Sequence, residues 1–348
     1  MQTWLNDGGK TFGRALVAAT LFSLGLASNT AAQTRIRLAT LIPSGTSYHH
    51  SLQDMGAKWK AASNGALALT IYADGTMGSE DEVVRRMRVG QLQAAVLTVA
   101  GLAEIERSVS ALQEMPLVYR SLDEAAFVRE KMAPDLDRRL AAKGFVVLFW
   151  VDAGWVRFFS KSPGMVPEDF KKMKIFVTAG DVTQSDLLKS AGYNPVLLEW
   201  SDALTSLQTG MIDAVPTIPL QALTGQYFLS THHMLEVNWV PLVGALIMTK
   251  KSWDALQPAE RDAIMKSATQ CGEEFQARGR QESQESLDAM AKRGLQIHPL
   301  NKEQQEAWER FSVSLYPKIR GNLVSADMFD SVLQLLHEYR GTQGASGK

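Results

Sequence analysis

The sequence has 348 residues, with 45% hydrophobic and 21% charged residues, which are ordinary values for a globular protein. Its formal net charge of −1 gives no basic surface for nucleic acid, so nothing in the composition predicts a nucleic-acid-binding protein. The single cysteine, Cys271, cannot form an internal disulfide, which excludes a disulfide-stabilised secreted scaffold.

The first 32 residues have the pattern of a secretory signal peptide. Lys10 and Arg14 precede an uncharged stretch at 15–26, and small residues follow at 30–32. The uncharged stretch is shorter than the about 20 residues that a membrane-spanning helix needs. No cysteine lies nearby for lipid attachment. We therefore expect cleavage after Ala32 and a soluble, exported chain, and the low cysteine content favours a bacterial periplasm.

Strands and helices alternate in the residues that follow. Apolar runs predict strands at 36–41, 67–72 and 94–99, with amphipathic helices between them. Ser79 and Glu82 have the spacing of a capping box at the start of the second helix. This β-α-β-α-β order predicts a parallel sheet with helices on both faces.

A second unit of the same kind follows a predicted helix at 122–143. Further strands are expected at 144–151, 157–160, 174–178, 195–198, 213–216 and 243–249. The sequence therefore has two α/β units. A chain of this length also exceeds what one hydrophobic core usually serves, so two domains are expected.

The segment 258–292 is predicted to form one long helix. Ile264, Ala268, Cys271 and Phe275 have the spacing of one helix face, whereas residues 276–286 are nearly all polar. Such a helix would be packed against the protein at both ends and exposed to solvent in its middle. Cys271 is then most simply a core residue and not a nucleophile. Two more helices at 302–320 and 326–339 precede a polar tail at 341–348.

Residue patterns of enzymes and metal sites are missing from the sequence. Neither a nucleophile motif nor a phosphate-binding loop is present, and Cys271 has no histidine near it in the sequence. The histidine pairs 49–50 and 232–233 are adjacent, and neighbouring side chains on a helix or strand point to different faces. We therefore predict no catalytic residues, no bound metal and no cofactor.

The carboxyl ends of the predicted strands are where an open parallel sheet binds its ligands. Asp181 and Gln184 have capping spacing, so Asp181 is expected to be a helix cap. The strand ends supply hydroxyl groups, glycines and aromatic rings with few titratable groups, which favours holding a small molecule over breaking one. The strand ends are Leu41–Ser44, Thr98–Gly101, Thr178–Asp181, Glu199–Trp200 and Thr217.

Four segments resemble the solute receptors of TRAP transporters, the DctP family. They occur in the family's order and with its spacing, and the resemblance extends over about residues 34–340. The segments are "YADGTMGSEDEVVRRMRVGQLQAAV" (72–96), "PEDFKKMKIFV" (167–177), "LTSLQTGMIDAV" (204–215) and "PLVGALIMTKKSWDALQPAERDAI" (241–264).

The resemblance implies an α/β, two-domain hinged periplasmic-binding-protein architecture with crossover strands and a long domain-spanning helix. The implied divisions are a signal peptide (1–32), domain I (33–151, completed by about 241–300), domain II (152–240), the bridging helix (258–292), C-terminal helices (301–340) and a polar tail (341–348). Bending is expected at 150–155 and 238–243, so that the domains close around an organic acid for an ion-coupled membrane transporter.

One departure from the family concerns the carboxylate anchor. Most relatives have arginine where this chain has Phe176, and a phenyl ring cannot make the bidentate contact of a guanidinium. A second family arginine aligns with Val156, one place before Arg157. A shift of one residue on a strand reverses the side chain's direction. Arg157 is therefore either a displaced anchor or a surface charge.

We predict a periplasmic receptor, acting as a monomer with TRAP membrane subunits, for a monocarboxylate with an apolar body. Simple dicarboxylates should bind poorly without the arginine. The rival functions are an exported α/β hydrolase or lyase and a lipid-carrying or interaction module. The candidate ligand-binding residues are Ser44, Tyr48, Thr98, Trp155, Arg157, Phe176, Thr178, Thr217 and Trp239.

Overall fold

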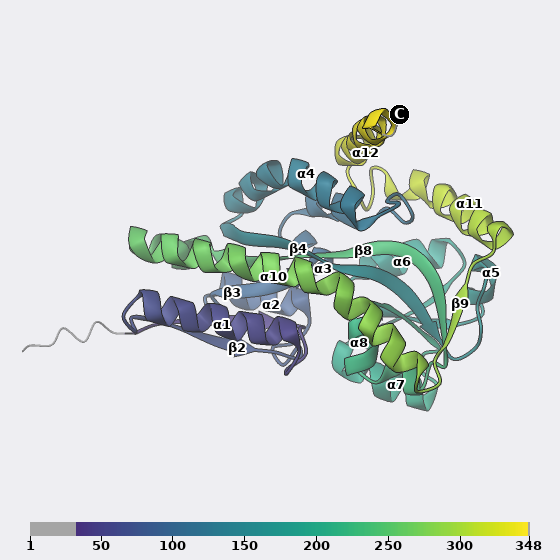
Figure 1. The fold of residues 1–348 in the computed structure, drawn as a ribbon, viewed down its shortest axis with the longest axis horizontal. Coiled ribbons are helices and arrows are strands. Elements are labelled where there is room, and N and C mark those ends of the chain that lie inside the picture. Colours follow the sequence, from purple (N-terminus) through teal and green to yellow (C-terminus); the bar gives the residue numbers. More distant parts are fainter. Residues whose placement is uncertain (1–32, 347–348) are drawn as a thin grey trace, which may run out of the picture. The chain divides into compact units, whose positions relative to one another are not determined.

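The computed structural model describes residues 33–346, so the predicted signal peptide at 1–32 lies outside the described residues. Strands and helices alternate at the start of the described chain, as the apolar runs predict (Figure 1). The elements of this first part are β1 (Thr34–Thr40), α1 (Ser47–Ala62), β2 (Leu67–Tyr72), α2 (Glu80–Arg88), β3 (Ala94–Thr98), α3 (Val99–Ala103), η1 (Arg107–Leu112) and α4 (Leu122–Ala142).

The second alternation lies between two unusually long strands, β4 (Phe145–Ser160) and β8 (His233–Thr249). Its elements are α5 (Pro167–Phe170), β5 (Lys174–Thr178), α6 (Val182–Ser190), β6 (Asn194–Leu198), η2 (Trp200–Asp202), α7 (Ala203–Thr209), β7 (Ala214–Thr217), α8 (Pro219–Thr224) and η3 (Tyr227–Leu229). The chain continues with α9 (Lys250–Asp254), α10 (Pro258–Ala291), β9 (Gln296–Pro299), α11 (Lys302–Ile319) and α12 (Ala326–Ser346).

The nine strands of residues 33–346 belong to one sheet of order β2-β1-β3-β8-β4-β7-β5-β6, with β9 paired to β8. Within each outer group, β1–β3 and β5–β7, the paired strands are parallel, as predicted. The long strands β4 and β8 lie between the groups and pair antiparallel to each other, to β3 and to β7. The two parallel groups are therefore joined through a shared antiparallel pair.

β4 corrects the prediction of two separate strands at 144–151 and 157–160. Asp152-Ala153-Gly154 resembles a turn in the sequence, yet the strand continues through it with register shifts against β8 between Asp152 and Trp155 and between Val156 and Phe158. Gly154 has a φ of +100°, a conformation that only glycine adopts without strain. The irregular pairing absorbs the extra residues and bends the strand without ending it.

Helix α10 confirms the prediction of one long helix and lies along β4, with α1 near one end and α8 near the other (Figure 1). Ile264, Ala268, Cys271 and Phe275 are buried in one core cluster, so the predicted apolar face is confirmed. Near the middle, a Cβ at Gly279 would lie 2.8 Å from the hydroxyl of Tyr48, so the missing side chain permits the close approach of α10 to α1.

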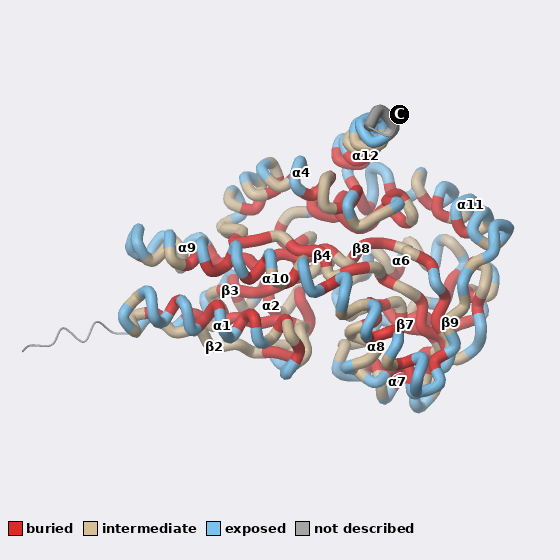
Figure 2. Tube along the Cα trace, in the orientation of Figure 1, coloured by how far each residue is buried: buried red, intermediate tan, exposed pale blue. Residues whose placement is uncertain are grey.

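Burial follows the layers of this sheet (Figure 2). The central strands are buried along most of their length, and the helices bury one face and expose the other. No helix among residues 33–346 is long and apolar enough to cross a membrane. The last helix extends to Ser346, beyond the predicted end at 339.

The two predicted caps have different outcomes. Asp181 accepts a hydrogen bond from the backbone N–H of Gln184 at 3.0 Å, so it caps α6 as predicted. The capping box predicted for Ser79 is wrong, because its side chain makes no cap hydrogen bond and donates to the Asp81 carboxylate instead.

Candidate functional site

The carboxyl ends of the parallel strands in both groups point toward the middle of β4 and β8. β3 ends where Thr98 pairs with Gly244 of β8, and β7 ends where Thr217 pairs with Arg157 of β4. A cavity of about 230 Å³ lies between these ends. Its wall includes the last residue of four parallel strands, which is a threonine each time: Thr40, Thr98, Thr178 and Thr217.

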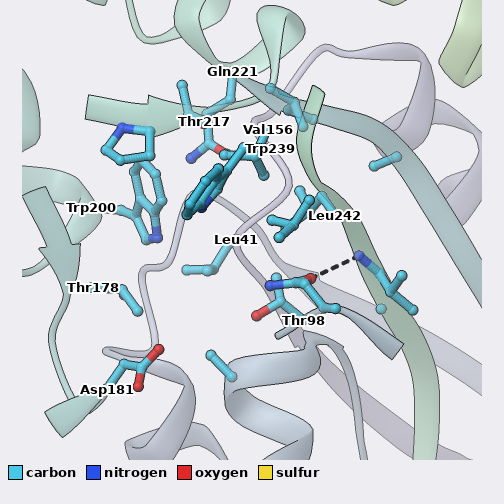
Figure 3. A pocket seen from close by; sticks show the side chains of 18 of the residues that line it. Leu41, Thr98, Val156, Thr178, Asp181, Trp200, Thr217, Gln221, Trp239 and Leu242 are labelled. Carbon is cyan, nitrogen blue, oxygen red and sulfur yellow. Dashed lines mark hydrogen bonds between the residues drawn. The ribbon is translucent and has the colours of Figure 1, made fainter. Parts of the chain in front are cut away.

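Aromatic rings form one part of the cavity wall. Trp200 and Trp239 both line the cavity, and Figure 3 shows their indole rings above Thr178 and Asp181 in this view. Trp200 packs against Phe176, with ring centroids 4.4 Å apart. Trp239 packs edge-on against Trp308 at 5.6 Å. Each of these two indole rings is thus packed against another buried ring of the cavity wall.

Tyr48 of α1 brings another aromatic ring to the cavity from the opposite group of elements. Its ring packs edge-on against Phe275 of α10, with centroids 4.6 Å apart, and both residues line the cavity. Burial raises the pKa of Tyr48, and the charges of Glu282 and Asp152 add to that rise. The hydroxyl therefore remains a neutral donor at physiological pH.

Three carboxylates also line the cavity: Glu80, Glu114 and Asp181. They come from three separate places, namely the first turn of α2, the residues after η1, and the turn between β5 and α6. No lysine, arginine or histidine of the described residues lines it. The neutral hydrogen-bonding groups in the wall are hydroxyls, indole N–H groups and the amides of Gln113, Gln184 and Gln221.

Glu80 is bound within the protein. Although only 7% exposed, it accepts hydrogen bonds from the backbone N–H of Thr98 at 2.7 Å, the Thr98 hydroxyl at 2.5 Å and the backbone N–H of Gly101 at 3.1 Å. Burial raises the pKa of Glu80, while these three donors oppose the rise. The backbone donors at the start of α3 are consequently occupied by the chain's own carboxylate.

Glu114 has fewer partners. It is 9% exposed, and Oε1 accepts a hydrogen bond from Nε2 of Gln113 at 3.2 Å. Oε1 of Gln113 in turn accepts from the backbone N–H of Val243 on β8, at 2.9 Å. Burial raises the pKa of Glu114 to about 8, and the negative charge of Asp181 contributes to the rise. Gln113 therefore links Glu114 to the middle of β8.

Asp181 faces the same cavity from the β5–α6 turn, and Figure 3 shows its carboxylate directed toward the interior. Burial raises the pKa of Asp181, the capping hydrogen bond from Gln184 opposes this, and the charge of Glu104 reinforces it. Asp181 is thus both a helix cap and a polar group of the cavity wall. Its capping bond occupies the N-terminal donor of α6 that faces it.

The residues predicted from the sequence fall into two sets. Six of the nine line the cavity, and Ser44, Trp155 and Arg157 do not. Ser44 is exposed and donates from its hydroxyl to Asp74 at 2.5 Å. Trp155 packs against another part of the core. The six that line the cavity are Tyr48, Thr98, Phe176, Thr178, Thr217 and Trp239.

Arg157 forms an ion pair with Glu236, with 3.4 Å between Nη1 and Oε1, and its Nε atom is buried without a hydrogen-bond partner. Its neighbour Val156 lines the cavity instead. Arg157 could therefore anchor a solute carboxylate only by leaving this pair and moving into the cavity.

Sequence reasoning missed Glu80 and Glu114 as cavity residues. Glu80 was interpreted only as part of a helix start, because its reach across to Thr98 is a tertiary contact between residues 18 positions apart. Glu114 did carry a signal, since it is an acidic residue within the otherwise mostly apolar run 109–118. An acid in such a run is either paired or functional.

Among the residues that the structure describes, no group of three or more histidine, cysteine, aspartate or glutamate residues is placed to hold a metal ion. The rival function, an exported hydrolase or lyase, would need a nucleophile with a neighbouring base. Cys271 is buried on the inner face of α10, and burial raises its pKa to about 12, so it is a neutral thiol. This arrangement can bind a small molecule through rings, hydroxyls, amides and carboxyl groups.

Residues 38–322 match the model of the family DctP, bacterial extracellular solute-binding protein family 7. The chain is 23% identical to the C4-dicarboxylate-binding periplasmic protein DctP of Rhodobacter capsulatus over 298 residues, 85% of this chain and 89% of the relative. It is 26% identical to the 2,3-diketo-L-gulonate-binding periplasmic protein YiaO of Escherichia coli over 293 residues, 81% of this chain and 87% of the relative.

The fold is also similar to that of solved structures. A TRAP periplasmic solute-binding protein from Pseudomonas putida F1 with bound D-glucuronate superposes with a TM-score of 0.75 at 24% identity, covering 86% of this chain and 96% of that one. This likeness confirms the predicted fold class, an α/β periplasmic-binding architecture with crossover strands and a long helix.

Proposed function

The chain belongs to the DctP family of bacterial extracellular solute-binding proteins, and we propose that it is the substrate receptor of a TRAP-type, ion-coupled transporter. The observation that supports this role most strongly is the position of the cavity. It lies where the carboxyl ends of two groups of parallel strands meet, between elements that can move apart to admit a solute.

The domains close around the solute by bending of the two long strands. β4 pairs irregularly with β8 between Asp152 and Trp155, and this segment lies between the places where β3 and β7 attach. Bending at 150–155 and 238–243 would leave both groups of parallel strands intact. The expected division at these crossings, with domain I at 33–151 and domain II at 152–240, is part of the proposal.

The solute has an apolar body and a small polar group. The aromatic part of the wall, including Phe176, Trp200 and Trp239, suits a ring or branched chain. The sequence predicts a carboxylate as the polar group, and the ligands named for the relatives are organic acids. In this cavity a carboxylate would depend on neutral donors, namely threonine hydroxyls, amides and indole N–H groups.

The receptor works in the periplasm as a monomer, delivers its solute to the membrane subunits and catalyses no reaction. The relatives are named as periplasmic binding proteins, which supports the location and the role.

The test begins with the solute that co-purifies with the protein, identified by mass spectrometry after denaturation. Added back to stripped protein, that solute should raise the melting temperature, because a ligand at a hundredfold excess over Kd stabilises the folded state by about 2.7 kcal/mol. Small-angle scattering should also show a smaller radius of gyration at saturation. A bound solute that leaves both quantities unchanged would contradict the proposal.

A further inference from the structure

The electrostatic character of the cavity is opposite to what a solute anion needs. The carboxyl groups in its wall are those of Glu80, Glu114 and Asp181. No basic side chain of residues 33–346 lines it. A buried carboxylate of a solute is bound stably only where donors or a cation replace its hydration. Here the wall offers a buried anion no cation.

The places that could receive an anion are occupied by the chain itself. Glu80 accepts from the backbone N–H groups of Thr98 and Gly101, and Asp181 accepts from that of Gln184. These two carboxylates use the backbone donors at the starts of α3 and α6. A solute anion would have to displace an internal carboxylate from each of these positions.

Three arginines on α2, α4 and β4 are paired with carboxylates of the chain. Arg85 of α2 binds Asp81, Arg129 of α4 binds Asp152 in a buried pair at 3.6 Å, and Arg157 of β4 binds Glu236. Moving any of them into the cavity would leave a carboxylate without its partner. A buried pair is costly to break in this way.

Further acids surround the carboxyl groups of the cavity. Glu104, at the end of α3, adds its charge to the environment of Asp181. Glu199, after β6, lies close enough to Asp81 and Glu82 of α2 that their charges act on it. Acidic side chains from both groups of strands therefore lie near one another around this part of the protein, and such a grouping favours cations over anions.

We infer that the polar group of the solute is a cation, a protonated amine on an apolar or aromatic body, held by Glu114 and Asp181 against the indole rings. This inference rests on the proposed receptor function and specifies its substrate class. The ammonium group would supply the hydrogen-bond donors that Glu114 lacks beyond Gln113. The faces of Trp200 and Trp239 favour a neighbouring cation as well.

The inference is tested with solutes of one body and three end groups. Calorimetry at pH 7 compares 3-phenylpropylamine, 3-phenylpropan-1-ol and 3-phenylpropanoate, together with the corresponding isobutyl and benzyl sets. We expect the amine to bind at least about tenfold more tightly than the alcohol, since a hydrogen bond to a charged group contributes more than one between neutral groups. The acid should bind most weakly.

Variants locate the effect. Glu114→Gln keeps the shape of the side chain and removes its charge, and it should weaken amine binding about tenfold or more and alcohol binding by clearly less. Asp181→Asn retains capping ability and should act in the same direction. Glu130→Gln, on the exposed surface of α4, removes one negative charge away from the cavity and should change none of the affinities.

Three results would overturn the inference. If the acids bind as tightly as the amines, the inference of a cationic solute is wrong, whereas the proposed receptor function stands. If no member of any set binds, the amine class is also rejected, and the co-purified solute then decides the receptor function independently. An amine that binds equally well to wild type and Glu114→Gln would show that Glu114 does not hold it.

Discussion

The aromatic part and the carboxylate part of the cavity wall are stabilised in different ways. Trp239 is backed by Phe158, Trp308 and Phe311, so folding itself secures this part of the wall. Glu114 and Asp181 are desolvated near each other without a cation. Burial without a counter-ion costs stability. Packing therefore shapes the part of the cavity that holds the apolar body of the solute. The part that holds the polar group becomes fully stable only when the solute is bound.

The largest effect on stability is expected from the aromatic part. Trp308 is 1% exposed and contacts Phe158, Phe170, Trp239 and Phe311. Trp308→Ala should lower the free energy of unfolding by about 3–5 kcal/mol, because it leaves a cavity among these rings. Urea unfolding measures this, with the exposed Leu333→Ala as control. A loss below about 1 kcal/mol would mean that this cluster does not secure the wall.

The carboxylate part should behave in the opposite way. A carboxyl group whose pKa rises from 4.5 to about 8 on folding binds more protons in the folded state than in the unfolded state between these values. Stability of the solute-free protein is then full below pH 4.5 and is lost as the pH rises toward 8.

Glu114→Gln removes this titration, so at pH 8 the solute-free variant should be more stable than wild type, and near pH 4.5 the two should be similar. Urea unfolding across this range gives the difference between the two proteins, which cancels the titration of other groups. A difference that stays constant with pH would show that Glu114 is not held at a raised pKa.

An intermediate effect is expected at the crossing between the two groups of strands. Gly154 has a φ of +100° where β4 shifts register, so Gly154→Ala should cost about 1 kcal/mol or more. Gly341→Ala in α12 is the matched control, because that glycine has no positive φ and no neighbour near the added methyl. Equal unfolding free energies for both variants would remove the argument for a bent crossing.

The smallest effect is expected at Cys271. Its thiol is 2% exposed, on the face of α10 that packs in the core, and it is not among the cavity residues. Cys271→Ser should therefore leave solute affinity within about tenfold, which corresponds to 1.4 kcal/mol. Calorimetry with the co-purified solute measures this, and a larger loss would show that this face of α10 contributes to the site.

Sequence patterns predicted the regular elements of the fold well, because periodicity and strand length are local properties. The apolar face of α10 and the cap at Asp181 are examples. The single strand β4 was missed, because Asp152-Ala153-Gly154 has the composition of a turn and only pairing with β8 keeps it extended.

The candidate site was predictable only in part. The threonines at strand ends follow from the parallel order of the strands, which the sequence indicates. Glu80 and Glu114 reach the cavity through contacts with Thr98 and Gln113 that depend on the tertiary fold. The pairing of Arg157 with Glu236 similarly depends on how β4 and β8 lie together.

The most direct test of the central claim is the number of protons exchanged when the solute binds. Calorimetry of the co-purified solute at pH 7, repeated in buffers with different ionisation enthalpies, gives this number without requiring that the solute be known in advance. In the solute-free protein at pH 7, Glu114 carries a proton because its pKa is raised to about 8. The other titratable groups in or near the cavity are Glu80, Glu104, Asp181 and Tyr48. A cationic solute lowers the pKa of Glu114, so binding should release close to one proton. Uptake of a proton would contradict the account, because it is the result expected when an anion binds beside these carboxyl groups.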